Sequence, residues 1–203
     1  MLGEMKFNNF TKKIASNSPV PGGGSVAAMG AAVAAALTEM VANLTIGKKK
    51  YVLEQEEMEK IAGLAEKYRE KFSRDMDRDA EAFDSVMEAY KIPKDTEEEK
   101  RSNAIQSAAK KAAEVPLEVA RDAFELMKWI EIVVEKGNSN AVTDGAVAAM
   151  MARTAVLSAL YNVKINLCSI TDQSFLRKTE SEVKQLEEGC QIMERKILAK
   201  VKL

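Results

Sequence analysis

The sequence has no histidine and only two cysteines, Cys168 and Cys190. The commonest side chain for zinc binding and for general acid–base catalysis is therefore missing. The two cysteines do not have metal-ligand spacing, and so small a number is typical of a protein from a reducing compartment. We therefore expect no bound metal. Any proton transfer has to use a carboxyl group of raised pKa, a lysine or a tyrosine.

Residues that interrupt helices or pack in β-sheets are also scarce. The 203 residues include four prolines and ten glycines, and aromatic residues make up 5%. Much of the remainder is Ala, Leu, Met, Glu and Lys, which lose least on entering a helix. The length allows a substantial core within one domain. The composition therefore predicts an all-α fold, a multihelical bundle that forms a single domain over residues 1–203.

Neither sign of charge is in excess, because 30 basic residues are interspersed with 31 acidic ones. Without a basic stripe, we expect no nucleic-acid partner. The longest apolar run, Val26–Leu37, is shorter than the roughly 20 residues that a bilayer span needs, so we expect no membrane partner. The N-terminus lacks the basic-then-apolar pattern of a signal peptide. These features predict a soluble, cytoplasmic protein.

Apolar periodicity and helix-breaking residues divide the chain into about seven helices. We expect them at about residues 6–15, 25–46, 54–90, 96–115, 116–136, 143–169 and 173–203. Thr96 and Glu99 form a capping box for the fourth helix, Pro116 is expected to end or kink it, and Asp172 is expected to cap the last. The helices at 25–46 and 143–169 are rich in alanine and apolar all round, which predicts that both are buried.

A glycine-rich loop, Ser18–Ser25, leads into the first of these Ala-rich helices. Free backbone N–H groups at a helix N-terminus favour a negative or carbonyl-bearing ligand group. No Lys-Ser/Thr pair follows the glycines, so the loop is not a Walker motif. The alternative is a tight loop in which Ser25 is the N-cap. Three consecutive glycines, Gly22, Gly23 and Gly24, exceed what a turn needs and favour close approach of a ligand.

Asp79 lies on the apolar stripe of the third expected helix, which runs from Met58 to Tyr90 in steps of three or four residues. Burying a carboxylate is costly unless the group is paired or hydrogen-bonded. Two explanations stay open. Asp79 is either a structural partner of a basic residue on another helix or a functional carboxyl group, whose pKa the nearby Asp75 and Asp84 would raise.

A second polar loop, at residues 137–140, opens the other Ala-rich helix and is followed by Asp144. Taken singly, Asp144 is a capping carboxylate, and the asparagines of this region satisfy neighbouring backbone groups. Those asparagines are Asn138, Asn140, Asn162 and Asn166. Two polar loops that each open a buried helix suggest instead that the two helix starts frame one pocket.

Several segments together resemble the formimidoyltetrahydrofolate cyclodeaminase / methenyltetrahydrofolate cyclohydrolase family. The similarity follows nearly the whole chain in order. The segments are 18–28, 40–45, 47–51, 79–83, 90–94, 114–117, 137–138, Asp144 and 162–167. Thr143 stands where the family pattern has serine, a mild change because the hydroxyl remains.

The resemblance implies a multihelical, usually dimeric enzyme that acts on one-carbon tetrahydrofolates, with no cofactor besides its folate substrate. Its Ala-rich helix, Val26–Leu37, is expected in the dimer interface or the central core. Asp79 and Asp144 are the expected catalytic carboxylates. The expected substrate-binding residues are Ser18, Gly22, Gly23, Gly24, Ser25, Asn43, Lys48, Lys49, Lys50, Tyr51, Asn140, Asn162 and Asn166. The lysines suit the glutamate tail of a folate, or else simply solvate a helix end.

Two reactions are consistent with this resemblance. One is hydrolysis of methenyltetrahydrofolate to formyltetrahydrofolate, and the other is cyclodeamination of formimidoyltetrahydrofolate, which releases ammonia. The transferase domain of bifunctional members is not within these residues, so we expect the hydrolase to outrank the ammonia-lyase. The alternative is a non-catalytic folate-binding module or dimeric helical interaction protein.

Overall fold

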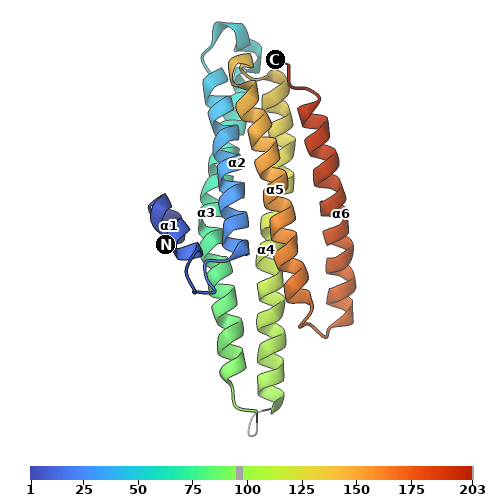
Figure 1. The fold of residues 1–203 in the computed structure, drawn as a ribbon. Helices are drawn as coiled ribbons and strands as arrows, with labels where there is room; N and C mark the ends of the chain where they lie inside the picture. The colour runs from blue at the N-terminus through green and yellow to red at the C-terminus, as the bar shows by residue number, and fades with distance from the viewer. Residues whose placement is uncertain (95–97, 203) are drawn as a thin grey trace.

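The computed structural model describes residues 1–94 and 98–202, and this part of the chain is helical with no β-strand (Figure 1). Its α-helices are α1 (Phe7–Ile14), α2 (Gly23–Thr45), α3 (Gln55–Lys91), α4 (Glu98–Lys136), α5 (Val142–Leu167) and α6 (Gln173–Leu198). Short 3₁₀ helices occur at Leu2–Glu4, Lys49–Glu54 and Ser139–Ala141. The all-α class is as predicted, but the described residues form six α-helices rather than about seven. The proposed cap at Thr96 lies outside the described residues.

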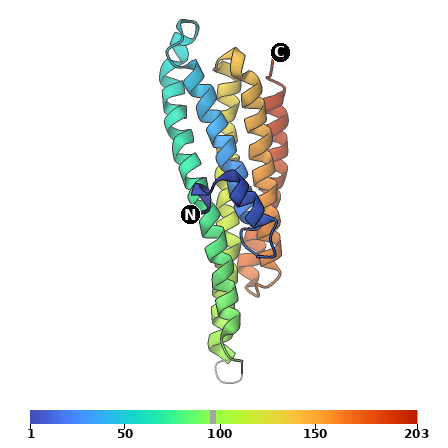
Figure 2. The same cartoon turned by 60° about the vertical axis from the view of Figure 1, so that its left-hand side comes forward.

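Helices α2, α3, α4 and α5 form an up-and-down bundle, and α6 packs against α4 and α5 (Figure 1). The N-terminal segment crosses the outside of α2 and α3 (Figure 2). Alanines of α2 and α5 are buried where the helices meet, and they include Ala28, Ala31, Ala35, Ala148 and Ala152. Small side chains let the two backbones approach closely. The predicted burial of the Ala-rich helices is therefore confirmed for their inner faces, whereas their outer faces are exposed.

The C-terminal end of α2 and the N-terminal end of α6 have the residues that are typical of helix termini. Gly47 has a φ of 75°, the left-handed conformation expected of a glycine just after a helix. The Asp172 side chain accepts hydrogen bonds from the backbone N–H groups of Ser174 and Phe175, which confirms it as the N-cap of α6.

The predicted break at Pro116 is wrong, because α4 continues through it. A proline inside a helix has no N–H, so the carbonyl four residues earlier loses its usual donor. That carbonyl belongs to Ala112, and the Asn166 side chain of α5 donates to it across 2.8 Å. The second amide hydrogen of Asn166 goes to the Asn162 carbonyl at 2.9 Å. A side chain on a neighbouring helix thus supplies the missing hydrogen bond.

We expect Asn166→Ala to lower the free energy of unfolding by about 1–3 kcal/mol, the cost of leaving a buried carbonyl without a donor. Chemical denaturation followed by circular dichroism measures this loss. Asn103→Ala, at an exposed position of the same α4 helix, is the matched control and should cause no loss, since alanine is the better helix former. Equal stability of Asn166→Ala and the parent would contradict this role.

Two helical stretches, Gly23–Thr45 and Ser139–Leu167, are long and apolar enough by composition alone to cross a membrane. In this fold they form the central α2–α5 pair, and 56% and 44% of their most apolar windows are buried. Core helices of soluble bundles pass the same test, so composition gives only weak support for a membrane span.

Candidate active site

Helix α2 begins two residues earlier than the sequence predicts. Gly22 is the N-cap, and Gly23 and Gly24 form the first turn of the helix instead of belonging to the loop. Ser25 is therefore not the N-cap. The loop before the helix is held locally, since the Ser18 hydroxyl donates to the Val20 carbonyl at 2.7 Å.

Asp79 of α3 lies directly against this first turn. Its Oδ2 atom is 3.0 Å from Oγ of Ser25, and the Ser25 backbone also hydrogen-bonds the carboxyl group. A Cβ atom on Gly24 would overlap Oδ1 of Asp79 and lie 2.7 Å from Oδ2. A glycine is therefore required here to leave room for the carboxyl group. The structure thus brings together Gly24, Ser25 and Asp79, three of the residues that the sequence singled out.

Burial raises the pKa of Asp79, and the hydrogen bonds from the Ser25 side chain and backbone partly oppose this rise. The Ser25 hydroxyl can donate to two acceptors, the Met76 carbonyl at 2.9 Å and Oδ2 of Asp79 at 3.0 Å. It has a single proton, so it donates to one of them at a time. When it donates to Met76, its oxygen can accept the proton of a neutral Asp79. The pair therefore accommodates both protonation states of the carboxyl group.

The structural ion pair that sequence leaves open for Asp79 belongs to its neighbour Asp75. Asp75 is 1% exposed and contacts Lys71 at 3.0 Å and Arg78 at 2.7 Å. Within residues 1–94 and 98–202, no basic side chain lies at ion-pair distance from Asp79. The buried charge of Asp75 is thus compensated by cations, whereas Asp79 has only hydrogen-bond partners.

The buried stripe of α3 also changes course near Asp79. Phe72 and Met76 are buried as predicted, but farther along the helix the buried residues are Ala82 and Ala89. Tyr90 is 48% exposed, so its predicted place in the core is wrong. Asp79 therefore lies at the edge of the core, half-buried and reachable from the surface.

Asn162 of α5 completes this end of the bundle. A Cβ atom on Gly23 would lie 3.2 Å from Nδ2 of Asn162, so the amide group packs on the first turn of α2. The side-chain NH₂ group of Asn162 donates a hydrogen bond to the Ser158 carbonyl at 2.9 Å. The carbonyl oxygen of its side chain remains as an acceptor beside Gly23. Asn166, in contrast, uses both amide hydrogens for structure, as described above.

A second polar cluster lies at the opposite end of α2. Its cavity of about 350 Å³ is lined by Lys48, Lys49, Lys50, Tyr51, Asn138, Ser139 and Asn140. Asn138 ties this cluster to α2, because its backbone N–H donates to Oγ1 of Thr45 at 2.8 Å and its side chain donates to the Leu44 carbonyl at 2.9 Å. Asp144 lies in the first turn of α5, just after this loop, and Asn43 is in the last turn of α2.

Tyr51 is the chemically distinctive member of the second cluster. Its phenol oxygen accepts a hydrogen bond from the Ser139 backbone N–H at 2.9 Å and lies 3.1 Å from the Ser139 hydroxyl. Lys50 lies over its ring, 5.1 Å from the centroid. The bonds from Ser139 and the adjacent Lys50 lower the pKa of Tyr51 to about 8. Ser139 could not be selected from the sequence, because its part in this cluster depends on contacts that only the fold creates.

The two clusters do not share a pocket within one chain. Thr45 follows Gly24 by 21 positions in α2, and a rise of about 1.5 Å per position separates the clusters by about 30 Å. Helices α2 and α5 are antiparallel, so their N-termini lie at opposite ends of the bundle (Figure 1). The prediction that the two helix starts frame one pocket is therefore wrong for a single chain. Asp79 and Asp144 therefore lie at opposite ends of the bundle.

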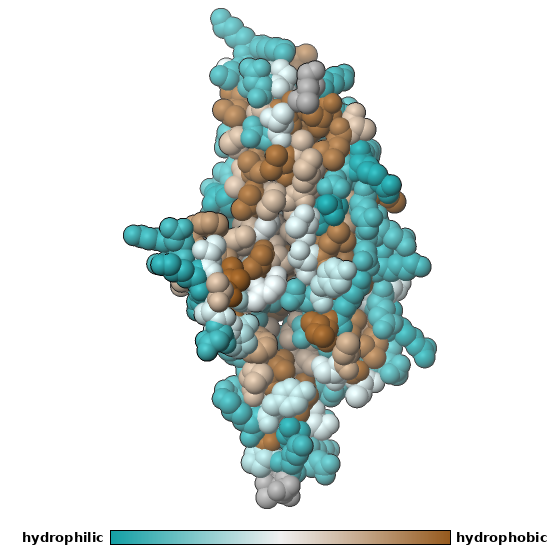
Figure 3. All heavy atoms as spheres, viewed as in Figure 1, coloured by the Kyte–Doolittle hydropathy of each residue, from teal (hydrophilic) through white to brown (hydrophobic). Residues whose placement is uncertain are grey.

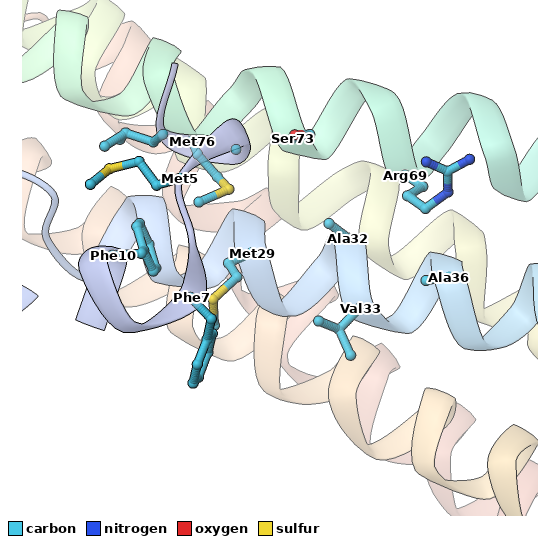
Figure 4. A pocket seen from close by; sticks show the side chains of 12 residues that line it. Met5, Phe7, Phe10, Met29, Ala32, Val33, Ala36, Arg69, Ser73 and Met76 are labelled. Carbon is cyan, nitrogen blue, oxygen red and sulfur yellow. The ribbon is translucent and has the colours of Figure 1, made fainter. Parts of the chain in front are cut away.

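An apolar cavity of about 290 Å³ lies beside the Asp79 cluster, under the N-terminal segment (Figure 4). Met5, Phe7 and Phe10 form its outer wall, and Met29 and Met76 form its floor. The segment is anchored by a hydrogen bond of 2.8 Å from the Leu2 N–H to the Asp77 carboxylate. Met76 belongs both to this cavity and, through its carbonyl, to the Ser25 contact. The sequence did not predict this cavity, because distant segments build it.

These features define a class: a helical bundle with a half-buried carboxyl group held at a helix N-terminus. In the described residues, no cluster of three His, Cys, Asp or Glu side chains could hold a metal ion. A sequence model of the formiminotransferase-cyclodeaminase family matches residues 6–185. The chain belongs to this family.

Individual proteins of this family are similar to the chain over most of its length. Over 189 residues the chain is 42% identical to a methenyltetrahydrofolate cyclohydrolase of Methylorubrum extorquens, covering 92% of this chain and 89% of the relative. It is 34% identical to the mouse formimidoyltransferase-cyclodeaminase, covering 91% of this chain but only 35% of that longer protein. The crystal structure of a formiminotetrahydrofolate cyclodeaminase from Thermotoga maritima superposes with a TM-score of 0.91 at 32% identity, covering 99% and 98% of the two chains.

Proposed function

We propose that the chain is an enzyme of one-carbon folate metabolism that hydrolyses methenyltetrahydrofolate to formyltetrahydrofolate. The observation that carries this proposal is the 42% identity to a protein of that name along nearly its full length. The contact between Asp79 and the first turn of α2 supports catalysis over mere folate binding. A non-catalytic scaffold would have no need of a glycine fitted so closely to a carboxyl group.

In this reaction, water attacks the cationic methenyl carbon, which lies between two nitrogens. The ionised carboxyl group of Asp79 stabilises the cation and accepts a proton from the attacking water. The carbon–nitrogen bond then breaks as one nitrogen is protonated, leaving the formyl group on the other. Because Ser25 accommodates both protonation states of Asp79, the same carboxyl group can take a proton from water and return it to the departing nitrogen. The remaining hydroxyl proton leaves as the formyl carbonyl forms, so that one proton is released overall.

The surroundings of Asp79 suit the rest of a folate. Free N–H groups at the start of α2 and the side-chain oxygen of Asn162 can fix the polar edge of the pterin. The neighbouring apolar cavity, lined by Phe7, Met29 and Met76, suits an aromatic ring.

Cyclodeamination of formimidoyltetrahydrofolate is the second candidate. The similarity to the Thermotoga maritima cyclodeaminase structure favours it. This reaction also passes through a tetrahedral carbon between nitrogens, so the same carboxyl group can serve. It additionally requires an acid that protonates the departing ammonia.

Parallel assays on the two folates separate these candidates. We expect purified protein to remove the near-ultraviolet absorbance of methenyltetrahydrofolate, and to release ammonia from formimidoyltetrahydrofolate more slowly or not at all. Ammonia release without methenyl hydrolysis would reverse the ranking. Inactivity toward both substrates, with binding of either retained, would favour a non-catalytic folate-binding protein.

A further inference from the structure

Helix α2 begins partway along its neighbours, so that below its start the bundle consists of α3, α4 and α5 with α6 beside them (Figure 1). Asp79 lies against the first turn of α2, but α3 continues from there to Lys91, about 18 Å farther at a rise of about 1.5 Å per residue. On the other side Asn162 packs on Gly23, and α5 continues to Leu167. Figure 3 shows that this face of the molecule is hollowed just below the start of α2.

Four residues of α3 are directed toward the space that α2 leaves. Steps of four, three and four residues place Phe83, Val86 and Tyr90 within about 40° of the direction of Asp79 around the helix axis. Phe83 and Val86 are half-buried, and Tyr90 is 48% exposed. We call these four residues the α3 strip. It combines a carboxyl group at its upper end with aromatic and aliphatic side chains below.

Arg101 of α4 lies at the lower end of the α3 strip. Its guanidinium group is 5.5 Å from the centroid of the Tyr90 ring and donates to the Tyr90 carbonyl at 3.5 Å. Its Nε atom is buried and has no hydrogen-bond partner. Within residues 1–94 and 98–202, no carboxylate lies at ion-pair distance from it. A half-buried guanidinium group is usually paired with an anion, so an anionic ligand at this point would supply the missing acceptor.

We propose that the α3 strip binds the benzoylglutamate part of the folate, with the benzoyl ring against Phe83 and Val86 and a glutamate carboxylate on Arg101. The inference rests on the proposed function, because it extends the site around Asp79 for the same substrate. Asp79 and Tyr90 are about 16 Å apart along α3. A folate has a comparable length from its reacting carbon through the benzoyl ring to the end of the glutamate. The planar fork of a guanidinium group also matches the two oxygens of a carboxylate.

The apolar cavity under the N-terminal segment is the other direction in which the benzoylglutamate part could extend. The basic residue in its lining, Arg69, is 2.7 Å from Glu39 and is therefore already paired. A glutamate that entered this cavity would lose water from its carboxylates without gaining a cation. The cavity therefore suits the pterin ring, and the rest of the folate extends past Asp79 along the α3 strip.

Arg101→Gln tests the carboxylate contact. We expect KM for methenyltetrahydrofolate to rise about tenfold or more, the usual effect of losing a hydrogen bond to a charged group. The value of kcat should stay within a few-fold, because the contact is distant from the reacting carbon. Methenyltetrahydropteroate, which lacks the glutamate, should have the same KM with variant and parent. Lys128→Gln, at an exposed α4 position about 40 Å away, is the matched control and should behave as the parent.

An unchanged KM in Arg101→Gln would overturn the proposal. So would an equal rise in KM for the two substrates, since a general disturbance of the fold affects both. Calorimetric binding of tetrahydrofolate separates these results from failure of the hydrolase function. A parent that hydrolyses neither substrate, but binds tetrahydrofolate more tightly than Arg101→Gln does, would remove the hydrolase and support the contact. A parent that binds no tetrahydrofolate would overturn the contact as well.

A second pair of variants supplies the anion from the protein itself. In Tyr90→Glu the new carboxylate lies beside Arg101 and occupies its guanidinium group, so KM for methenyltetrahydrofolate should rise as much as in Arg101→Gln. Tyr90→Gln has a side chain of the same size without the charge, and its KM should rise much less. Circular dichroism of each variant establishes that it is folded, which the exposure of Tyr90 favours. Equal KM values for the two folded variants would overturn the proposal.

Discussion

Asp79→Asn should reduce turnover of methenyltetrahydrofolate by about 100-fold or more, the usual range for loss of a general acid–base group. Asparagine has nearly the same shape and can still accept the Ser25 hydrogen bond. It cannot take a proton from water or carry the negative charge that stabilises the methenyl cation. The near-ultraviolet absorbance assay measures the loss.

Stability distinguishes this role from a structural one. Burial raises the pKa of Asp79 above its value in the unfolded chain, so the folded protein binds this proton more tightly. The contribution of Asp79 to stability is therefore most favourable in acid and declines as pH rises and the carboxyl group ionises. Asp79→Asn should match the parent in acid and be more stable at neutral pH. A variant that is less stable at neutral pH but retains activity would indicate a structural residue.

Gly24→Ala should have the second large effect. The added Cβ atom overlaps the Asp79 carboxyl group, which must move away from the helix N-terminus. Displacing a catalytic group by about 1 Å costs on the order of 100-fold in rate. We therefore expect a large fall in kcat with the helical circular dichroism retained.

Gly63→Ala is the matched control for this change. Gly63 is also helical, but a Cβ atom there would have no neighbour within 4 Å. Alanine should therefore leave activity unchanged and stabilise the protein by about 0.5–1 kcal/mol. Full activity of Gly24→Ala would show that Asp79 does not need its position against α2.

Most of the helices were predictable because they depend on local sequence. The periodicity of α3, Gly47 after α2 and Asp172 before α6 act within one or two turns of chain. The start of α2 was not predictable in this way. Gly23 and Gly24 are helical residues whose missing Cβ atoms leave room for Asn162 and Asp79, and these partners are far away in sequence.

The error at Pro116 also changes the direction expected of the second Ala-rich helix. With a break there, one more helix separates the two Ala-rich helices, and in an up-and-down bundle their N-termini then fall at the same end. With α4 continuous, α5 runs opposite to α2 and the two starts separate. The contact that compensates for the proline is the hydrogen bond from Asn166 to Ala112, between positions 54 residues apart. Such a contact between distant segments cannot be predicted from the residues around Pro116.

The same hydrogen bond makes the 39 residues of α4 dependent on a helix that follows it in the chain. In the unfolded chain the Ala112 carbonyl has no backbone donor at Pro116, so α4 is weakest there until α5 docks. Opening of α5 should therefore also release the amide protons around Ala112, so the middle of α4 exchanges hydrogen together with its neighbour as one cooperative unit.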